Sequence, residues 1–248
     1  MSTIKTCRIL GVNIAVTNMA QTVQYIENNL EELRGKYICV SNVHTTVMAH
    51  DNPAYRNVQN SAAIALPDGK PLSVVSRKRG YTEAERVTGP DLMGELFARK
   101  NGLKHFFYGD KEETLQILQK KLKEKYPDIQ IAGMISPPFR SLSQEEEKAY
   151  IQQINDSGAD IVWIGLGAPK QENWMYEHQG MLHGVMIGVG AGFSYHAGLI
   201  KRAPEWMQKL SLEWFYRLMQ DPVRLFKRYF TTNLKFMLLE AKDKGEVL

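Results

Sequence analysis

The sequence predicts an α/β fold: a Rossmann-like, mostly parallel and doubly wound sheet with a C-terminal helical appendage. Short apolar runs alternate with helical patterns up to about residue 198, which is typical of consecutive βαβ units. Some runs, such as residues 161–164 (IVWI), are apolar at every position, as strands buried on both faces are. After residue 198 no strand pattern remains. We therefore expect an α/β domain over residues 1–198 and a helical appendage over residues 199–248.

Each expected element rests on a local pattern. Residues 8–16 have the pattern of a strand or hairpin, and further apolar runs predict strands over residues 37–41, 62–66, 104–108, 129–135, 161–164 and 185–189. Helical spacing and N-terminal signals predict helices over residues 18–33, 45–58, 70–79, 90–99, 110–126, 143–155 and 169–181. Asn18 can cap the first of these helices. Asp110 with Glu113, and Ser143 with Glu146, have the spacing of capping boxes.

The predicted appendage consists of successive helices with a basic character. Residues 199–235 contain eight Lys or Arg and three Asp or Glu, in a chain whose formal net charge is only +4. In the last helix Arg224, Lys227 and Arg228 share one face, and aromatic residues populate another. This pattern suits an anionic membrane surface. Two alternatives are that the apolar face packs on the α/β domain or that it forms a homo-oligomer.

Composition indicates a folded protein of a reducing compartment. Hydrophobic residues make up 44% of the 248 residues and charged residues 23%. Cys7 and Cys39 are too few for a disulfide framework. Neither a signal peptide nor an apolar stretch long enough to cross a bilayer is apparent. We expect a cytoplasmic protein, or one bound to the membrane from the cytoplasm, with no nucleic-acid partner.

The stretch from Ala159 to Glu172 is the strongest candidate for a ligand site. Gly165 and Gly167 follow a buried strand and let the backbone turn sharply, and Pro169 suits the first turn of a helix. Ligands of open α/β folds bind at the C-terminal edge of the sheet, and a helix N-terminus there favours an anion. The alternative is an ordinary βα turn with polar residues on the surface.

Three charged residues in or beside predicted turns could carry chemistry. Asp68 follows a buried strand and could accept a proton in the crevice, although an aspartate in a Pro-Asp-Gly turn can also simply cap a helix. Arg86 could bind phosphate with two hydrogen bonds, or it could pair with Asp91 across the intervening Gly-Pro turn.

The sequence lacks the motifs of several common cofactor, metal and catalytic sites. Residues 188–193 (GVGAGF) fail the dinucleotide fingerprint at the third glycine, and there is no P-loop and no GxSxG elbow. The six histidines lack metal-binding spacing, and no Asp-x-Asp pair occurs. We therefore predict no cofactor and no metal.

Taken together, the motifs resemble the WecG/TagA/CpsF family of bacterial glycosyltransferases. The matching segments are residues 67–69 (PDG), 85–91 (ERVTGPD), 165–172 (GLGAPKQE), 188–191 (GVGA), 201–204 (KRAP) and 212–218 (LEWFYRL). The resemblance extends over roughly residues 9–236. It implies inverting, metal-independent transfer of a sugar from a UDP-sugar donor to a polyprenyl-diphosphate-linked saccharide at the inner membrane face. Such products feed teichoic acid, capsule or exopolysaccharide synthesis.

The resemblance also implies roles for individual residues. By the family pattern, Asp68 is the general base that deprotonates the acceptor hydroxyl. Asn42, Arg86 and Gln171 are implied in donor or acceptor binding. We predict that Asp91, Gly167, Lys170, Glu172 and Gly190 bind these substrates as well. Those implied in contact with the lipid diphosphate and the membrane are Arg217, Arg224, Lys227 and Arg228.

The chain departs from the family pattern at two places near the crevice. The family often has Asp where this chain has Ser194, and Thr-Pro-Asn where this chain has Val40-Ser41-Asn42. A role for a second carboxylate at position 194 is therefore not carried over. Two other functions stay open at this point: a non-catalytic nucleotide-sugar-binding scaffold, and an NAD-dependent enzyme that modifies a sugar nucleotide.

Overall fold

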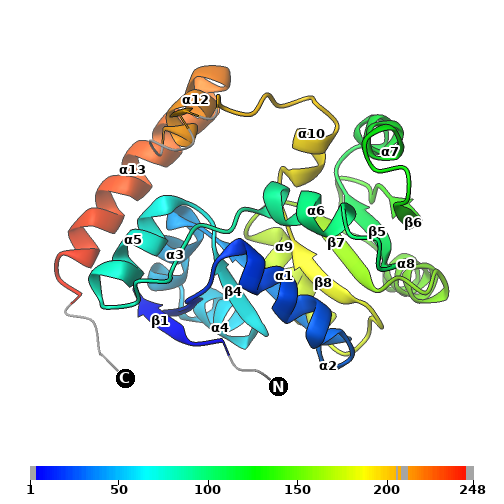
Figure 1. Cartoon of the computed structure of the whole chain (residues 1–248), viewed down its shortest axis with the longest axis horizontal. Helices are drawn as coiled ribbons and strands as arrows, with labels where there is room; N and C mark the ends of the chain where they lie inside the picture. The colour runs from blue at the N-terminus through cyan, green and yellow to red at the C-terminus, as the bar shows by residue number, and fades with distance from the viewer. Residues whose placement is uncertain (1–3, 205, 208–211, 244–248) are drawn as a thin grey trace.

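The computed structural model describes residues 4–204, 206–207 and 212–243, and within this part of the chain it contains an eight-stranded sheet (Figure 1). The strand order is β1-β2-β4-β3-β8-β7-β5-β6. β1 and β2 form an antiparallel hairpin, and all other neighbouring strands are parallel. The predicted mostly parallel α/β sheet is therefore confirmed.

The strands agree closely with the apolar runs of the sequence. They are β1 (Thr6–Ile9), β2 (Val12–Ala15), β3 (Tyr37–Ser41), β4 (Ile64–Pro67), β5 (Lys104–Gly109), β6 (Gln130–Ile135), β7 (Ile161–Gly165) and β8 (Val185–Gly188).

Helices fill the connections between the strands. They are α1 (Met19–Asn28), α2 (Leu30–Leu33), α3 (Val43–Asp51), α4 (Pro53–Ser61), α5 (Lys70–Lys78), α6 (Gly89–Phe97), α7 (Glu112–Lys125), α8 (Gln144–Asp156), α9 (Lys170–Glu177) and α10 (Gly192–His196). Two helices of the appendage follow, α12 (Glu213–Gln220) and α13 (Pro222–Glu240).

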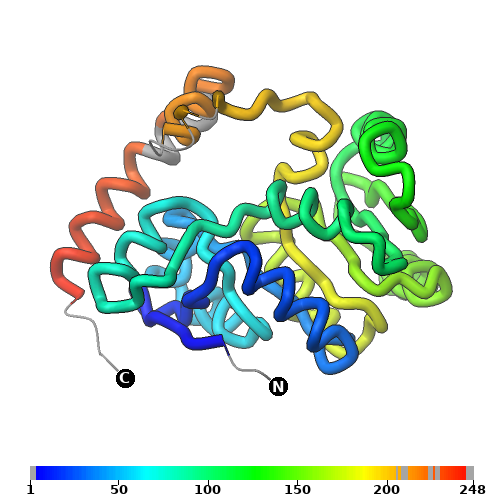
Figure 2. Tube along the Cα trace, in the orientation of Figure 1, coloured from blue at the N-terminus to red at the C-terminus, as the bar shows by residue number. Residues whose placement is uncertain are grey.

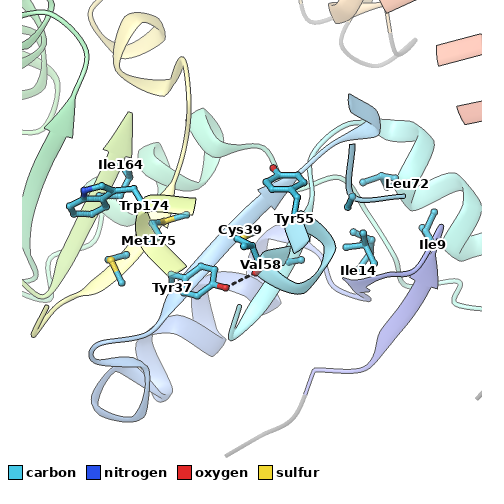
Figure 3. Close-up of a cluster of buried hydrophobic side chains, with 14 of the residues drawn as sticks. Ile9, Ile14, Tyr37, Cys39, Tyr55, Val58, Leu72, Ile164, Trp174 and Met175 are labelled. Atoms are coloured by element: carbon cyan, nitrogen blue, oxygen red, sulfur yellow. Dashed lines mark hydrogen bonds between the residues drawn. The ribbon is translucent and has the colours of Figure 1, made fainter. Parts of the chain in front are cut away.

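The sheet has a hydrophobic core on each face, because alternate strand residues point to opposite sides. Tyr37 and Cys39 of β3 pack with side chains of α3, α4, α5 and α9 on one face, and part of this core is drawn in Figure 3. Ile38 and Val40 pack with side chains of α1, α6, α7 and α10 on the other. The central strands are thus covered on both sides, which explains why their sequences are apolar at every position.

The topology brings distant loops together at the centre of the sheet. β3 lies between β4 and β8, although β8 follows β3 by more than a hundred residues. The helix that follows β3 covers one face of the sheet and the helix that follows β8 covers the other, so β3 and β8 flank a topological switch point. The loops after β3, β4, β7 and β8 all lie at the same C-terminal edge, where open α/β sheets bind ligands.

Local signals at helix ends were mostly but not always correct. Asn18 caps α1, and Ser143 with Glu146 forms the predicted capping box of α8. The helix predicted over residues 45–58 is instead two helices, because Asn52 has extended backbone and caps α4, which begins at Pro53. The capping box predicted at Asp110 is wrong: Asp110 has a positive φ of 59°, and α7 begins after Lys111.

The end of the appendage packs against the α/β domain. Phe236 of α13 is only 5% exposed and belongs to the core on the α3 side of the sheet. Arg79 binds Glu240 at 2.7 Å and Asp243 at 3.2 Å. Figures 1 and 2 show α13 running beside α5 and α3, while residues 197–204, which follow α10, pass above the sheet in this view. The predicted boundary between the α/β domain and the appendage at residue 198 stays a prediction.

Within the described residues, no helix is both long enough and apolar enough to cross a membrane.

Candidate active site

Asp68 lies beside the switch point, directly after β4. Its backbone N–H donates to the carbonyl of Ser41 at 2.7 Å, which ties the end of β4 to the end of β3. Burial raises the pKa of the Asp68 carboxyl from 3.8 to about 6, although Arg86 and Arg217 act to lower it and Glu213 acts to raise it. Asp68 is half-buried, so solvent can still reach this residue. A carboxyl group with this pKa can accept a proton near neutral pH.

A network of ion pairs joins this crevice to the appendage. Arg86 donates to Glu213 of α12 at 2.6 Å and lies 3.9 Å from Asp91. Arg202 donates to both oxygens of Asp91, at 2.7 and 3.2 Å, and its Nε lies 3.3 Å from Glu213. Burial acts to raise the pKa of Asp91, but hydrogen bonds from Arg202 and Thr88 hold it below its usual value. Arg86 and Asp91, predicted as ligand residues, therefore also anchor α12 over the sheet edge.

Arg217 is the predicted lipid-diphosphate residue whose side chain the structure describes. Its guanidinium lies over the ring of Tyr195 at 5.5 Å, and that of Arg202 lies near the same ring at 5.6 Å. The charge of Arg217 also lowers the pKa of Asp68, so Arg217 acts both on the ring of Tyr195 and on the Asp68 carboxyl. Arg224, Lys227 and Arg228 lie on α13, but their side chains fall outside the described part of the chain.

The structure places the side chains of Gln171 and Glu172 behind the glycine turns, with exposures of 4% and 1%. Gln171 Oε1 accepts hydrogen bonds from the backbone N–H groups of Gly167, at 3.2 Å, and Gly190, at 3.0 Å. Gln171 Nε2 donates to Glu172 Oε1 at 2.8 Å. Gln171 therefore braces the two turns, and the N–H groups of Gly167 and Gly190 are already engaged.

The buried polar contacts of Gln171 and Glu172 continue through further polar side chains. The hydroxyl of Tyr55 of α4 lies near the carboxyl of Glu172, whose pKa is raised by burial. Gln59 donates to the Tyr55 hydroxyl at 2.9 Å and accepts from Ser41 at 2.5 Å. The ends of β3 and β7 are thus connected beneath the crevice through polar side chains.

The remaining predicted residues lie at the same sheet edge. Asn42 caps α3, and its Oδ1 accepts from the N–H groups of His44 and Thr45 at 3.0 and 3.2 Å. Its other amide atom, Nδ2, has no hydrogen-bond partner among the described residues. The side chain of Lys170 is exposed on the first turn of α9.

Sequence reasoning missed three residues of the site: Glu213, Arg202 and Tyr195. Glu213 and Arg202 belong to the segments 212–218 and 201–204 that carry the family resemblance, so those motifs were a usable signal. Tyr195 follows the Gly-rich segment and had no signal of its own. Among the residues that the structure describes, no cluster of three or more His, Cys, Asp or Glu could hold a metal ion.

This arrangement defines a class of site. A carboxyl group able to take a proton, facing arginines at the switch point of a parallel sheet, suits group transfer from a ligand with an anionic leaving group.

Comparison with known proteins agrees with this class. The sequence profile of the glycosyl transferase WecG/TagA/CpsF family matches residues 7–246. The chain therefore belongs to this family.

Three curated relatives of the chain share the name N-acetylglucosaminyldiphosphoundecaprenol N-acetyl-beta-D-mannosaminyltransferase. The protein of Bacillus subtilis (strain 168) is 31% identical over 232 residues, which cover 92% of this chain and 88% of that protein. Those of Bacillus spizizenii and Staphylococcus aureus (strain MW2) are each 29% identical, over 91% and 95% of this chain and 90% and 93% of the relatives.

Proposed function

We propose that this chain is an inverting glycosyltransferase that moves a sugar from a UDP-sugar to a polyprenyl-diphosphate-linked saccharide during synthesis of a cell-surface polymer. The observation that carries the proposal is Asp68, whose pKa of about 6 places a proton acceptor among arginines at the sheet switch point. Family membership supports the reaction type.

Asp68 acts on the acceptor side of the reaction. Its ionised carboxylate takes the proton from the acceptor hydroxyl as the hydroxyl oxygen attacks the anomeric carbon of the donor sugar. The new C–O bond forms on the face opposite the bond to the diphosphate, and the configuration inverts. The bond to the diphosphate breaks, and its electron pair leaves with UDP.

The arginines act on the leaving-group side. The departing UDP gains negative charge, which Arg217, Arg86 and Arg202 can stabilise from fixed positions. These guanidinium groups could serve where other transferases use a divalent metal. Metal independence is therefore part of the proposal, and its test is activity in the presence of a chelator.

The names of the relatives suggest a specific donor and a specific acceptor. They describe transfer of N-acetylmannosamine to an N-acetylglucosaminyl-diphosphoundecaprenol. At about 30% identity over most of both chains, we propose UDP-N-acetylmannosamine as donor and a prenyl-diphosphate-linked N-acetylglucosamine as acceptor.

A lipid-linked acceptor requires contact with the membrane, and we propose that the appendage makes this contact at the inner face. Among the described residues, several large apolar side chains of α12 and α13 are exposed: Trp214, Phe215, Met219, Phe226, Phe230, Leu234, Met237 and Leu238. An apolar helix surface of this kind suits the boundary between headgroups and acyl chains.

The direct test is a transfer assay with Asp68→Asn. Purified chain is given UDP-N-acetylmannosamine and N-acetylglucosamine on a short prenyl diphosphate, with and without EDTA, and the product is identified by mass. We expect a product one N-acetylhexosamine heavier, formed equally well with EDTA. Asp68→Asn should lower turnover by about 10²- to 10⁴-fold, as loss of a general base does.

Asp128→Asn is the matched control, because Asp128 is an exposed carboxylate that binds Lys100 just before β6. It should leave turnover unchanged. Full activity of Asp68→Asn would exclude Asp68 as the base, and the absence of any product with UDP-linked sugars would reject the proposed donor.

A further inference from the structure

Asp110 is held in an uncommon conformation at the end of β5, and the proposed mechanism does not use it. Its φ of 59° lies in the left-handed region, which only Leu10 shares among the described non-glycine residues. The backbone N–H of Asp110 donates to the carbonyl of Gly165 at 3.2 Å, and its carbonyl accepts from the hydroxyl of Ser136 at 2.8 Å. Two other chain segments therefore fix the backbone of this one residue.

The carboxylate of Asp110 is fixed as well. Its Oδ1 accepts from the backbone N–H of Lys111 at 2.8 Å, and its Oδ2 accepts from the hydroxyl of Ser194 at 3.0 Å. Ser194 is itself anchored, because its carbonyl accepts from the N–H groups of Leu199 and Ile200. A carboxylate can accept about four hydrogen bonds, so each oxygen of Asp110 keeps one acceptor position. Both side chains are half-buried and remain accessible to a ligand.

The pair lies on the same sheet edge as Asp68, with cations between them. Ser194 is followed by Tyr195, whose ring lies beneath Arg217 and Arg202. Arg202 and Arg86 both bind Glu213, and the residue after Arg86 donates its N–H to the carbonyl of the residue before Asp68. The crevice thus has a carboxylate at each end and guanidinium groups in the middle. A nucleotide sugar has the complementary pattern, because its diphosphate lies between two groups rich in hydroxyls.

We propose that Asp110 and Ser194 form a subsite that binds the ribose diol of the donor nucleotide, an assignment that rests on the proposed function. The Asp110 carboxylate accepts hydrogen bonds from the two ribose hydroxyls. The diphosphate then lies toward Arg217, and the transferred sugar lies toward Asp68. A carboxylate at a strand end is the group that nucleotide-binding α/β folds use for ribose hydroxyls.

The charge of the pair excludes other ligand groups. A phosphate beside Asp110 would be repelled by the carboxylate, whereas a hydroxyl donates to it with the strength of a charge-assisted hydrogen bond. The hexose hydroxyls are the other source of a diol in the donor. They belong to the sugar whose anomeric carbon must react beside Asp68, at the opposite end of the crevice.

The test compares UDP with 2′,3′-dideoxy-UDP, which keeps the diphosphate and the base but lacks the diol. Both are titrated by calorimetry into the wild-type chain, Asp110→Asn and the control Asp128→Asn. Asn tolerates a positive φ, so Asp110→Asn should fold normally. We expect Asp110→Asn to weaken UDP binding about tenfold, which corresponds to about 1.4 kcal/mol, and to leave dideoxy-UDP binding unchanged. Asp128→Asn should change neither.

Each other outcome has a distinct meaning. Equal weakening of both nucleotides by Asp110→Asn would overturn the subsite, since the residue would then act without the diol. Unchanged UDP binding in Asp110→Asn would overturn it as well, while leaving the transferase proposal intact. If the wild-type chain bound no UDP at all, the donor proposal itself would fail and the subsite with it. If Asp110→Asn weakened only a UDP-sugar, and not UDP, the diol would be that of the hexose and the ribose assignment would be wrong.

Discussion

Asp68 combines a chemical advantage with a cost in folding stability. Its pKa of about 6 in the folded chain lies above the usual 3.8 because burial disfavours the ionised form. The folded state therefore binds this proton more tightly than the unfolded state does. The stabilising contribution of the group is fully present below about pH 4 and is lost as the pH rises through about 6.

Asp68→Asn should therefore be more stable than the wild-type chain at about pH 8, because the amide is neutral at every pH. We expect a gain of about 1 kcal/mol, which is less than the full value of the pKa shift because solvent screens a half-exposed carboxyl. The gain should disappear at about pH 4. Urea unfolding at the two pH values measures it, and Asp128→Asn again serves as the control. A loss of stability at pH 8 would show that Asp68 is retained for structure.

At the scale of residues, the sequence predicted on which edge of the sheet the candidate residues lie, but not the contacts of every side chain there. Asp68 was predictable because it follows a short apolar strand, and strand ends of a parallel sheet share one edge. Gln171 was expected to face the ligand, and its buried hydrogen bonds to Gly167 and Gly190 depend on the packing of α9 against the ends of β7 and β8. No local sequence pattern predicts that packing of α9. Asp110 was misassigned because its spacing to Glu113 matches a capping box, while its positive φ is set by contacts with β7 and Ser136.

Helix α12 carries two charges that act on Asp68 in opposite directions. Glu213 raises the pKa of Asp68 and Arg217 lowers it, and both effects require α12 to lie over the crevice. The ion pair of Glu213 with Arg86, at 2.6 Å, holds the helix there. A change in the position of α12 should therefore change the pKa of Asp68, although Asp68 belongs to a different part of the fold.

We expect the pH dependence of sugar transfer to move in opposite directions in Glu213→Gln and Arg217→Gln. In the wild-type chain the rate should rise with pH and level off above about pH 6, as the base ionises. Removing the negative charge of Glu213 should lower the midpoint, and removing the positive charge of Arg217 should raise it. The measurement is the pH–rate profile of each variant, including residual activity where turnover is reduced.

Glu124→Gln provides the control for this experiment, because Glu124 forms an exposed ion pair with Lys121 on α7. Its profile should match that of the wild-type chain. If all midpoints coincided, α12 would not lie over Asp68 in the working enzyme. If both α12 variants shifted in the same direction, a change of structure rather than of charge would be responsible.

At the scale of the whole molecule, the fold class was predictable and the order of strands was not. Alternating apolar runs and helices specify βαβ units, but nothing local places β8 beside β3. The position of the appendage could not be predicted from the sequence either, because it depends on the packing of Phe236 in the core and on the ion pairs of Arg79 with Glu240 and Asp243. These contacts pair residues that are far apart in the sequence.

The appendage is attached near both of its ends, and its apolar surface lies between them. Arg202 binds Asp91 near the crevice, and Phe236 packs into the core at the other end. Between these contacts Phe226 and Phe230 are 60% and 63% exposed, and their rings stack at 6.0 Å. Exposed aromatic pairs of this kind indicate an interaction surface, and a lipid acceptor favours the membrane as its partner.

Replacing both rings, in Phe226→Ser/Phe230→Ser, should weaken binding to vesicles that contain phosphatidylglycerol by at least about tenfold, since each buried Phe contributes roughly 1.5–3 kcal/mol. Co-sedimentation at low and moderate salt measures the binding, and salt should weaken it because anionic lipids contribute. Phe139→Ser is the matched control, because Phe139 is 82% exposed in the loop after β6. The double variant should keep its rate on a water-soluble acceptor. Unchanged vesicle binding would contradict the membrane role, and a wild-type dimer that the double variant dissociates would assign this face to self-association.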